Sequence, residues 1–389
     1  MYSANLYIYP MKRVSLFVLI LATVLNGFAQ QKIEKGQSFI FHGAIDKYPI
    51  TLILDVFDQE VSGRYYYQKF GNTIELRGRS NDSGYTLESA YGIENESETF
   101  ILRIFHNELM GTWTKNKKEL SVSVSRFRNP IDIYQYHHVV KSSEIIVQAG
   151  GNVSDNPDEW LQEAELSFTF LWPEEASKQA ESIRQTQFQQ LNRFQLGAEN
   201  ASAIRFDEPI DPRTVQGQPQ QLLHLMQRIS DTFFAQFTNS VMEAFNSGSK
   251  DYLGNVSLDI TNTFRYDSEK YQVLETTQSE YTGGAHGHYF QYHNTWGLEQ
   301  NKWIEMADVL TKKQIKGLPK AMTQSLKIAK GIPQKDPLDQ HGFWIKEFDS
   351  VGGDTYFTDL GLNTSFGLYE IAPYSEGIVE VFVAWKNLR

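Results

Sequence analysis

Val61-Ser-Gly-Arg-Tyr65 and Leu109-Met-Gly-Thr-Trp113 share one pattern, in which a glycine lies two positions after an apolar residue and two positions before an aromatic one. Leu76-Arg-Gly78 repeats part of this pattern between them. A glycine inside a strand usually marks a bulge or a sharp bend, which a small barrel needs where its strands curl. The pattern therefore predicts a closed or strongly curved sheet in this part of the chain.

The whole stretch 36–127 supports the same prediction. Short runs of β-branched and aromatic residues are separated by Gly, Asn and Asp at a spacing of about 8–12 residues, which is typical of a meander, sandwich or barrel. We expect about eight strands around a filled core, with a rim that is able to hold a ligand. The expected strands contain residues 39–41, 50–54, 61–67, 74–76, 85–87, 100–104, 109–113 and 120–124.

The rest of the chain mixes strands with helices. A strand at 165–172 is followed by Pro173-Glu-Glu, which is typical of a helix start, and a second helix carries an apolar stripe over 222–245. Strands return after residue 254, with a further helical region around 308–330. The predicted fold class is therefore α+β: an all-β barrel-like or curved-sheet domain, then antiparallel strands packed with two to three helices.

The length of 389 residues predicts two to three domains. The residue pattern changes near Asn129-Pro130, and this change marks the first boundary between domains. The predicted division is a signal peptide at 1–29, an all-β domain at 30–128, an α+β companion domain at 130–254 and a C-terminal α+β domain at 255–389.

The first residues have the features of an export signal. Met11-Lys-Arg13 is a short basic region, residues 14–25 are apolar, and Gly27-Phe-Ala29 fits the small-x-small cleavage pattern. We expect translation to start at Met11 and cleavage to follow Ala29. The apolar run is shorter than the ~20 residues of a membrane span. We therefore expect an exported protein without stable membrane insertion, located in the periplasm, on the cell surface or outside the cell.

Composition excludes several kinds of site. The chain has no cysteine, which rules out disulfides, thiolate metal sites and a cysteine nucleophile. The net charge of −11 becomes −13 when Lys12 and Arg13 leave with the signal peptide. Such an acidic surface argues against binding to nucleic acid or to anionic membranes. It suits a basic protein partner, and it also serves solubility.

The most unusual run is Tyr281-Thr-Gly-Gly-Ala-His-Gly-His288. If it continues as a strand, His286 and His288 project from one face, and Tyr281 and Tyr292 approach them when the flanking strands pair. Two histidines can begin a zinc site, but zinc normally needs at least three protein ligands. His293, Asp267 and Glu280 are candidates for the third ligand, and the spacing selects none of them.

The alternative interpretation of this run is a tight glycine turn whose imidazoles hydrogen-bond to backbone or to neighbouring tyrosines. We favour it, and we predict neither a metal nor a cofactor. A second compact segment, Tyr369-Glu-Ile-Ala-Pro-Tyr-Ser-Glu-Gly377, has the same ambiguity. Glu370 and Glu376 are possible paired carboxylates for acid–base chemistry, or else parts of a structural loop.

The predicted binding residues are Tyr281, His286, His288, Tyr292 and Tyr374. The residues predicted to shape the two turns are Gly283, Gly284, Gly287 and Pro373. No catalytic residue is predicted, because the chain lacks a nucleotide-binding glycine loop, a Gly-x-Ser-x-Gly elbow and a His-Glu-x-x-His motif.

Tyr281-Thr-Gly-Gly-Ala-His-Gly287 and Tyr369-Glu-Ile-Ala-Pro-Tyr374 resemble the C-terminal domain of unknown function shared by RsiV-type anti-sigma factors and PdaC-type peptidoglycan deacetylases. The resemblance covers residues 255–389, and residues 130–254 look like the companion domain that usually precedes it. It implies a bacterial envelope or secreted setting. In the anti-sigma members the paired domains sense lysozyme, and in the deacetylases they accompany a separate catalytic domain.

The chain departs from both groups, because it lacks a transmembrane helix with a sigma-binding segment and also the zinc motifs of the deacetylase domain. We therefore expect an exported soluble binding protein that recognises a cell-wall glycan, such as a peptidoglycan fragment, or a protein such as lysozyme. One alternative is a cell-wall glycan hydrolase or deacetylase that uses His286 and His288. Another is an envelope scaffold protein.

Overall fold

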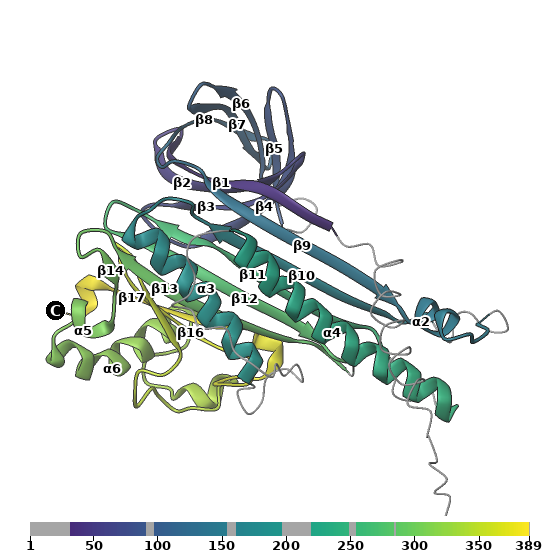
Figure 1. Ribbon diagram of the computed structural model, residues 1–389. Helices are drawn as coiled ribbons and strands as arrows, with labels where there is room; N and C mark the ends of the chain where they lie inside the picture. The colour runs from purple at the N-terminus through teal and green to yellow at the C-terminus, as the bar shows by residue number, and fades with distance from the viewer. Residues whose placement is uncertain are drawn as a thin grey trace, which may run out of the picture.

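The structure is a computed structural model that describes residues 32–90, 97–153, 161–196, 219–248, 254–283 and 285–388 (Figure 1). The predicted signal peptide lies outside the described residues. Two sheets account for the strands of the described chain, one of 14 strands and one of three. The larger sheet closes on itself over its first eight strands, and this closure produces the barrel predicted from the glycine pattern.

The barrel strands are β1 (Lys32–Ile45), β2 (Tyr48–Phe57), β3 (Glu60–Tyr67), β4 (Thr73–Asn81), β5 (Gly84–Ser89), β6 (Thr99–Phe105), β7 (Glu108–Lys115) and β8 (Lys118–Arg126). Each of the eight expected strand segments lies inside one of them. The barrel closes where β1 pairs with β8, with Phe41 opposite Arg126 and Ile45 opposite Val122. Its interior is filled by a buried apolar cluster that includes Leu52, Phe100 and Trp113.

The repeated glycines lie where neighbouring strands of the barrel approach most closely. A Cβ added at Gly63 would stand 2.3 Å from the carbonyl oxygen of Ile53. At Gly111 the corresponding distance, to the carbonyl oxygen of Ile101, is 1.8 Å. Because a side chain at either position would collide with backbone, the curvature of this sheet requires glycine there.

Strand β1 belongs to the barrel and also to the open part of the sheet. Its second half pairs with β8, while its first half pairs with β9, for example Lys32 with His137. The open part continues through β9 (Ile131–Lys141), β10 (Glu163–Trp172), β11 (Val256–Asp267), β12 (Tyr271–Tyr281), β13 (His288–Gly297) and β14 (Lys302–Trp303). The predicted boundary between 130–254 and 255–389 therefore falls between two paired strands, β10 and β11.

The expectation of purely antiparallel strands after the barrel is wrong at one place. Strands β10 and β11 are parallel, with Ala164 opposite Val256. Parallel neighbours need a crossover connection. Helices α3 (Lys178–Leu196) and α4 (Pro219–Ser247) occupy that connection. The sequence predicted both helices, but not their role as a crossover between parallel strands.

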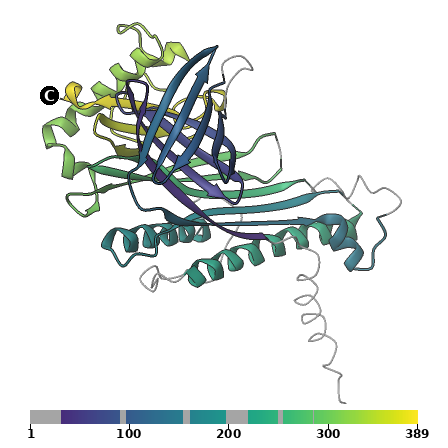
Figure 2. The same cartoon turned by 90° about the horizontal axis from the view of Figure 1, so that it is seen from above.

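Helices and barrel cover opposite faces of the open sheet, as Figure 2 shows from above. On one face, α4 and the short α2 (Ser142–Gln148) bury Leu225, Ile229 and Ile146 against Phe168 and Ile260. The apolar stripe predicted for residues 222–245 is thus core. On the other face, the barrel wall makes an apolar contact that joins Ile40, Ile53 and Phe57 to Ile133 and Leu171.

The C-terminal region packs beside β12 and β13. It contains α5 (Met306–Val309), α6 (Lys312–Ala329), β15 (Asp354–Phe357), β16 (Gly361–Phe366) and β17 (Val379–Ala384), with 3-10 turns η3 (Leu338–His341), η4 (Tyr374–Glu376) and η5 (Trp385–Leu388). The three strands form an antiparallel sheet that buries Leu362 and Val381 against Leu318 and Met322 of α6. Within the described residues, none of the helices is both long and apolar enough to span a bilayer.

The close approach at Gly111 gives a direct test of the barrel. Gly111→Ala is expected to lower the free energy of unfolding by about 3 kcal/mol or more, because the new methyl group meets the Ile101 carbonyl. The matched control is Gly317→Ala in α6, where a Cβ meets nothing within 4 Å. That change is expected to stabilise the protein by about 0.5–1 kcal/mol through helix propensity. Urea unfolding measures both, and equal effects would contradict the barrel geometry.

Candidate functional site

The two unusual segments of the sequence meet in space. His286 Nε2 lies 3.0 Å from the hydroxyl of Tyr369, and the Tyr374 hydroxyl donates a hydrogen bond of 3.1 Å to the carbonyl of Gly287. The rings of His286 and Tyr374 stack, with centroids 4.1 Å apart and planes 25° from parallel. Residues more than 80 positions apart in the chain therefore form one surface cluster.

Trp344 extends this cluster. Its ring lies almost parallel to that of Tyr369, at 15° and with centroids 6.2 Å apart. Trp344 is 55% exposed and Tyr369 is 45% exposed. We call the set His286, Trp344, Tyr369 and Tyr374 the aromatic platform. A group of large rings this open to solvent is unusual outside binding surfaces.

The backbone at Tyr369 is strained. Its φ of 62° places a non-glycine residue with a bulky ring in the left-handed region, which costs about 1–3 kcal/mol and persists only when the surroundings enforce it. Glu370 helps to hold this turn, because its carboxylate accepts a hydrogen bond of 2.7 Å from the Gly367 amide. In this backbone conformation the Tyr369 ring lies beside Trp344 and His286.

The turn residues lie as follows. Gly283 has a φ of 91°, and a Cβ at Gly287 would stand 2.7 Å from the Glu280 carbonyl oxygen. Pro373 immediately precedes η4, which supplies Tyr374. Gly284 lies outside the described residues.

The structure brings only some of the predicted binding residues together. His286 and Tyr374 belong to the platform, and the ring of His288 lies 6.1 Å from that of His286. Tyr281 pairs with Ser257 at the end of β12. Strand alternation therefore places it on the opposite face from His288, which pairs with Glu280. Tyr292 shares the face of His288 but lies four residues further along β13.

The three candidates for a third zinc ligand are engaged elsewhere. His293 lies between Glu275 and Asp354, Asp267 pairs with Arg128, and Glu280 accepts a hydrogen bond from Gln278. No group of three or more possible metal ligands occurs in the described part of the chain. The carboxylates of the second segment are also separated, since Glu376 pairs with Lys330 while Glu370 binds the Gly367 amide.

A buried ion network connects the barrel, the open part of the large sheet and the three-stranded C-terminal sheet. Glu275 on β12 accepts from Arg64 of β3 at 2.7 Å, and Arg265 of β11 lies 3.6 Å from the same carboxylate. Its other contact is His293 Nε2 at 3.1 Å, and His293 Nδ1 in turn lies 2.5 Å from Asp354 of β15. Strands of the barrel, the open sheet and the C-terminal sheet are therefore connected through one carboxylate.

Contacts within this network shift the pKa values of Glu275 and His293. Burial would raise the pKa of Glu275, but Arg64, Arg265 and His293 hold that pKa well below its usual range. Burial would likewise lower the pKa of His293, yet its hydrogen bonds to Asp354 and Glu275 raise this pKa to about 9. Both groups are therefore charged at neutral pH.

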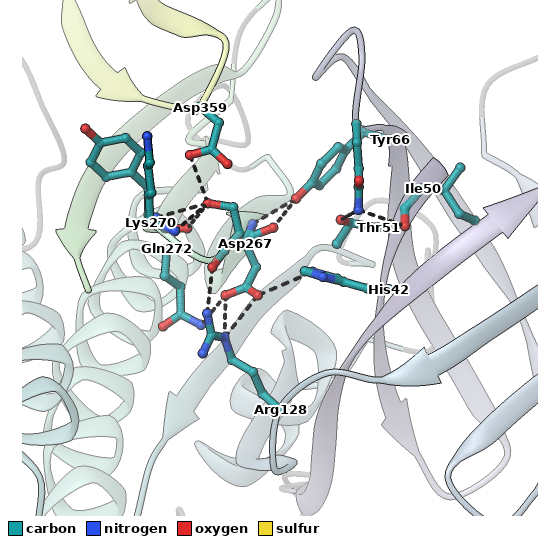
Figure 3. Close-up of polar contacts among 12 residues, drawn as sticks. His42, Ile50, Thr51, Tyr66, Arg128, Asp267, Lys270, Gln272 and Asp359 are labelled. Carbon is teal, nitrogen blue, oxygen red and sulfur yellow. Dashed lines mark hydrogen bonds and ion pairs between the residues drawn. The ribbon is translucent and has the colours of Figure 1, made fainter. Parts of the chain in front are cut away.

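A second polar junction lies at Asp267 (Figure 3). Arg128 donates to both carboxylate oxygens of Asp267, at 2.7 and 3.0 Å, and to the carbonyl of Ser268 at 2.7 Å. Tyr66 of the barrel donates to the Asp267 carbonyl at 2.6 Å. Burial raises the pKa of Asp267 to about 6 against the effect of Arg128, and burial lowers the pKa of the nearby His42 to about 4.

Next to the Glu275 network, a cleft of about 780 Å³ separates the barrel wall from the open sheet. Its barrel side consists of outward-facing residues of β2, β3 and β4, including Asp55, Arg64 and Glu75. Its floor is the face of β9–β13 that points away from helices α3 and α4. Asp55 reaches across one end of it, because the Thr263 hydroxyl donates a hydrogen bond of 3.2 Å to its carboxylate.

The cleft floor is built from rows of polar side chains. One row crosses five neighbouring strands, each residue standing opposite the next: Gln135, Thr169, Thr261, Thr277 and Gln291. We call this the threonine row. The adjacent row contributes Ser167, Asp259 and Tyr289 to the same floor.

Sequence reasoning missed this cleft, although part of its signal is visible. In Val256-Ser-Leu-Asp-Ile-Thr-Asn-Thr263 a polar residue stands at every second position, which indicates that one face of the strand is not core. The sequence does not tell what that face meets. This polar face becomes one wall of a cleft because the barrel lies over it.

Comparisons with known proteins place the chain near one family of unknown function. The family model described as "Protein of unknown function (DUF3298)" matches residues 307–386, which include Trp344, Tyr369 and Tyr374 but not His286. No curated protein matches the chain. The identity of the domain at 307–386 thus rests on the family model.

Solved structures that are similar to the chain include two members of the same family. One is a DUF3298 family member from Bacteroides fragilis NCTC 9343, with 14% identity and a TM-score of 0.45, covering 58% of this chain and 83% of that one. The other is a DUF3298 family protein from Pseudomonas aeruginosa PAO1, with 13% identity and a TM-score of 0.40, covering 67% of this chain and 93% of that one.

The charge of His293 makes stability depend on pH. Its pKa of about 9 in the folded protein exceeds the value of about 6.5 expected for an unfolded chain. The stabilisation is therefore complete below pH 6.5 and is lost as the pH rises through 9, by about 3 kcal/mol in total. Unfolding free energies measured from pH 6 to pH 10 should show this loss in the native protein and a flatter profile in His293→Gln.

The matched control is His137→Gln, which removes a half-exposed imidazole paired with Glu165 at 2.9 Å. This variant should keep the native pH profile. A similar profile for His293→Gln and the native protein would contradict the assignment of the titrating group.

Proposed function

We propose that this chain is an exported binding protein of the bacterial cell envelope and that the aromatic platform is its contact surface. The partner is a protein such as lysozyme or, as a second candidate, a cell-wall glycan. The observation that carries the proposal is the platform itself, in which two distant segments and a strained tyrosine hold exposed rings in a fixed arrangement. Its setting is the periplasm, the cell surface or the exterior.

The shape and charge of the surface favour a protein partner. Small ligands are usually held in concave sites, whereas Trp344 and Tyr369 are open to solvent. Tryptophan and tyrosine are the residue types most often found to dominate protein–protein binding energy. The net charge of −11 would attract a basic protein such as lysozyme and increase its association rate at low salt.

The resemblance of the 281–287 and 369–374 segments to the domain of RsiV-type anti-sigma factors and PdaC-type deacetylases supports the same proposal. In the anti-sigma members this region senses lysozyme. Three of the four platform residues, His286, Tyr369 and Tyr374, lie in the two segments that carry the resemblance. The proposal is therefore that this chain has kept the shared surface.

The stacked rings favour the glycan as the second candidate. Sugar rings present apolar C–H faces that pack on aromatic rings, and the near-parallel Trp344 and Tyr369 offer two such surfaces side by side. The affinity for a glycan would depend little on salt, because stacking of sugar rings on the platform involves no ion pair. Salt dependence therefore distinguishes the two candidates.

Binding is measured with the purified protein against lysozyme and against soluble peptidoglycan fragments, by calorimetry at low and at high salt. Trp344→Ala and Tyr369→Gly are each expected to weaken binding at least ~30-fold, the effect of losing ~2 kcal/mol at a hot spot. Tyr369→Gly removes the ring but relieves the backbone strain, so the protein should remain folded.

The matched control is Phe70→Ala, since Phe70 is an aromatic residue of the barrel with 60% exposure, away from the platform. The Phe70→Ala variant should bind lysozyme or peptidoglycan fragments with the affinity of the native protein. Failure to bind either partner, or an equal loss in all three variants, would argue against the platform as the contact surface. Turnover of acetylated glycan that disappears in folded His286→Ala would favour an enzyme instead.

A further inference from the structure

We infer that the cleft between the barrel wall and the open sheet is a second binding site, for a short neutral oligosaccharide. This site is distinct from the platform and does not rest on the function proposed for it. None of its lining residues falls within the 307–386 match. The cleft exists because the N-terminal barrel lies over the sheet, so it is a property of this arrangement of domains.

The two faces of the open sheet differ sharply. On the helix face, Leu166, Phe168 and Ile260 are fully buried in an apolar core. On the cleft face the intervening positions are Ser167, Thr169 and Thr261. The Thr261 hydroxyl donates to Asp259 at 3.3 Å, and all three residues remain partly exposed. A polar, partly exposed face between two layers is suited to contact with water or with a polar ligand.

The size of the floor suits an extended ligand. Neighbouring strands are ~4.8 Å apart, so the five residues of the threonine row span roughly 19 Å. The volume of about 780 Å³ lies in the range of pockets that hold small ligands. A ligand along the threonine row would meet a hydroxyl or amide group at each strand.

The charges of the cleft argue for a neutral ligand. Four arginines line the cleft, Arg64, Arg77, Arg79 and Arg265, against five acids, so the lining has no excess of positive charge to attract a phosphate or a carboxylate. Arg64 and Arg265 both face Glu275, while Arg77 and Arg79 are exposed on β4. Asp259 and Glu75 also line the cleft, and burial raises the pKa of each. Placing an anion beside these acids would be unfavourable, whereas a neutral molecule with hydroxyl groups can donate to them.

The mixture of donors and acceptors points to sugar hydroxyls. Threonine hydroxyls and glutamine amides both donate and accept, as sugar hydroxyls do, and carboxylates accept from them. Tyr289 adds an aromatic ring at the floor, with its hydroxyl bound by Gln291 at 3.1 Å. An extended peptide fits less well, because the floor is the face of a paired sheet and offers no free strand edge.

The test is calorimetric binding of chitotetraose, cellotetraose and maltotetraose to the full chain, with inorganic phosphate as the anionic comparison. At least one tetrasaccharide should bind, and phosphate should not. The double variant Thr261→Val, Thr277→Val keeps the shape of the row but removes two hydroxyls. It is expected to weaken sugar binding about 30-fold, the effect of losing two hydrogen bonds of about 1 kcal/mol each.

A control variant establishes whether the sugar binds in the cleft. Thr86→Val, at an exposed position on β5, should leave sugar affinity and stability unchanged. A tetrasaccharide held at the platform would be bound equally well by the native protein and by the folded double variant. The inference is overturned if no tetrasaccharide binds, if phosphate binds instead, or if the folded double variant binds as the native protein does.

Discussion

Glu275 is a single buried carboxylate on which the arrangement of the layers depends. Leaving such a charge unpaired away from water would cost several kcal/mol, so its contacts with Arg64, Arg265 and His293 have to form together. Each partner comes from a different strand and extends the network further: His293 to Asp354, Arg265 to Glu380 and Arg64 to Glu75. The barrel, the open sheet and the C-terminal sheet are thus held in fixed positions by one polar centre.

This way of joining layers leaves room for the cleft. Apart from the pairing of β1 with β9, barrel and sheet touch through limited apolar contacts, one around Phe57 and Leu171 and one where Tyr66 stacks on Tyr266. Discrete polar links at Glu275, Asp267 and Asp55 complete the connection. A continuous apolar interface would have required apolar residues along the threonine row. Because the links carry the connection, the rest of the sheet face is free to be polar without loss of the relative placement of the domains.

Local patterns predicted the barrel and the helical stripes, because curvature at Gly63 and Gly111 and burial of Ile229 depend on spacing along the chain. The parallel pairing of β10 with β11 depends on how a long connection returns, which spacing does not encode. The candidate binding sites were likewise predictable only in part. The residues His286 and Tyr374 were recognisable, but their stacking joins segments far apart in the sequence. Glu275 gave no signal at all, since one acid in a strand is ordinary until its partners are known.

The β12–β13 hairpin links all of these features. At its middle lie Glu275 and His293, which anchor it to the barrel and to the C-terminal sheet. Thr277 and Gln291, one step further along, stand opposite each other in the cleft floor. The turn at its far end carries His286 into the platform. A hairpin fixed at its middle by a buried ion network presents the neighbouring cleft residues and the turn in defined positions. The same interaction that holds the layers together therefore also preorganises both candidate binding surfaces.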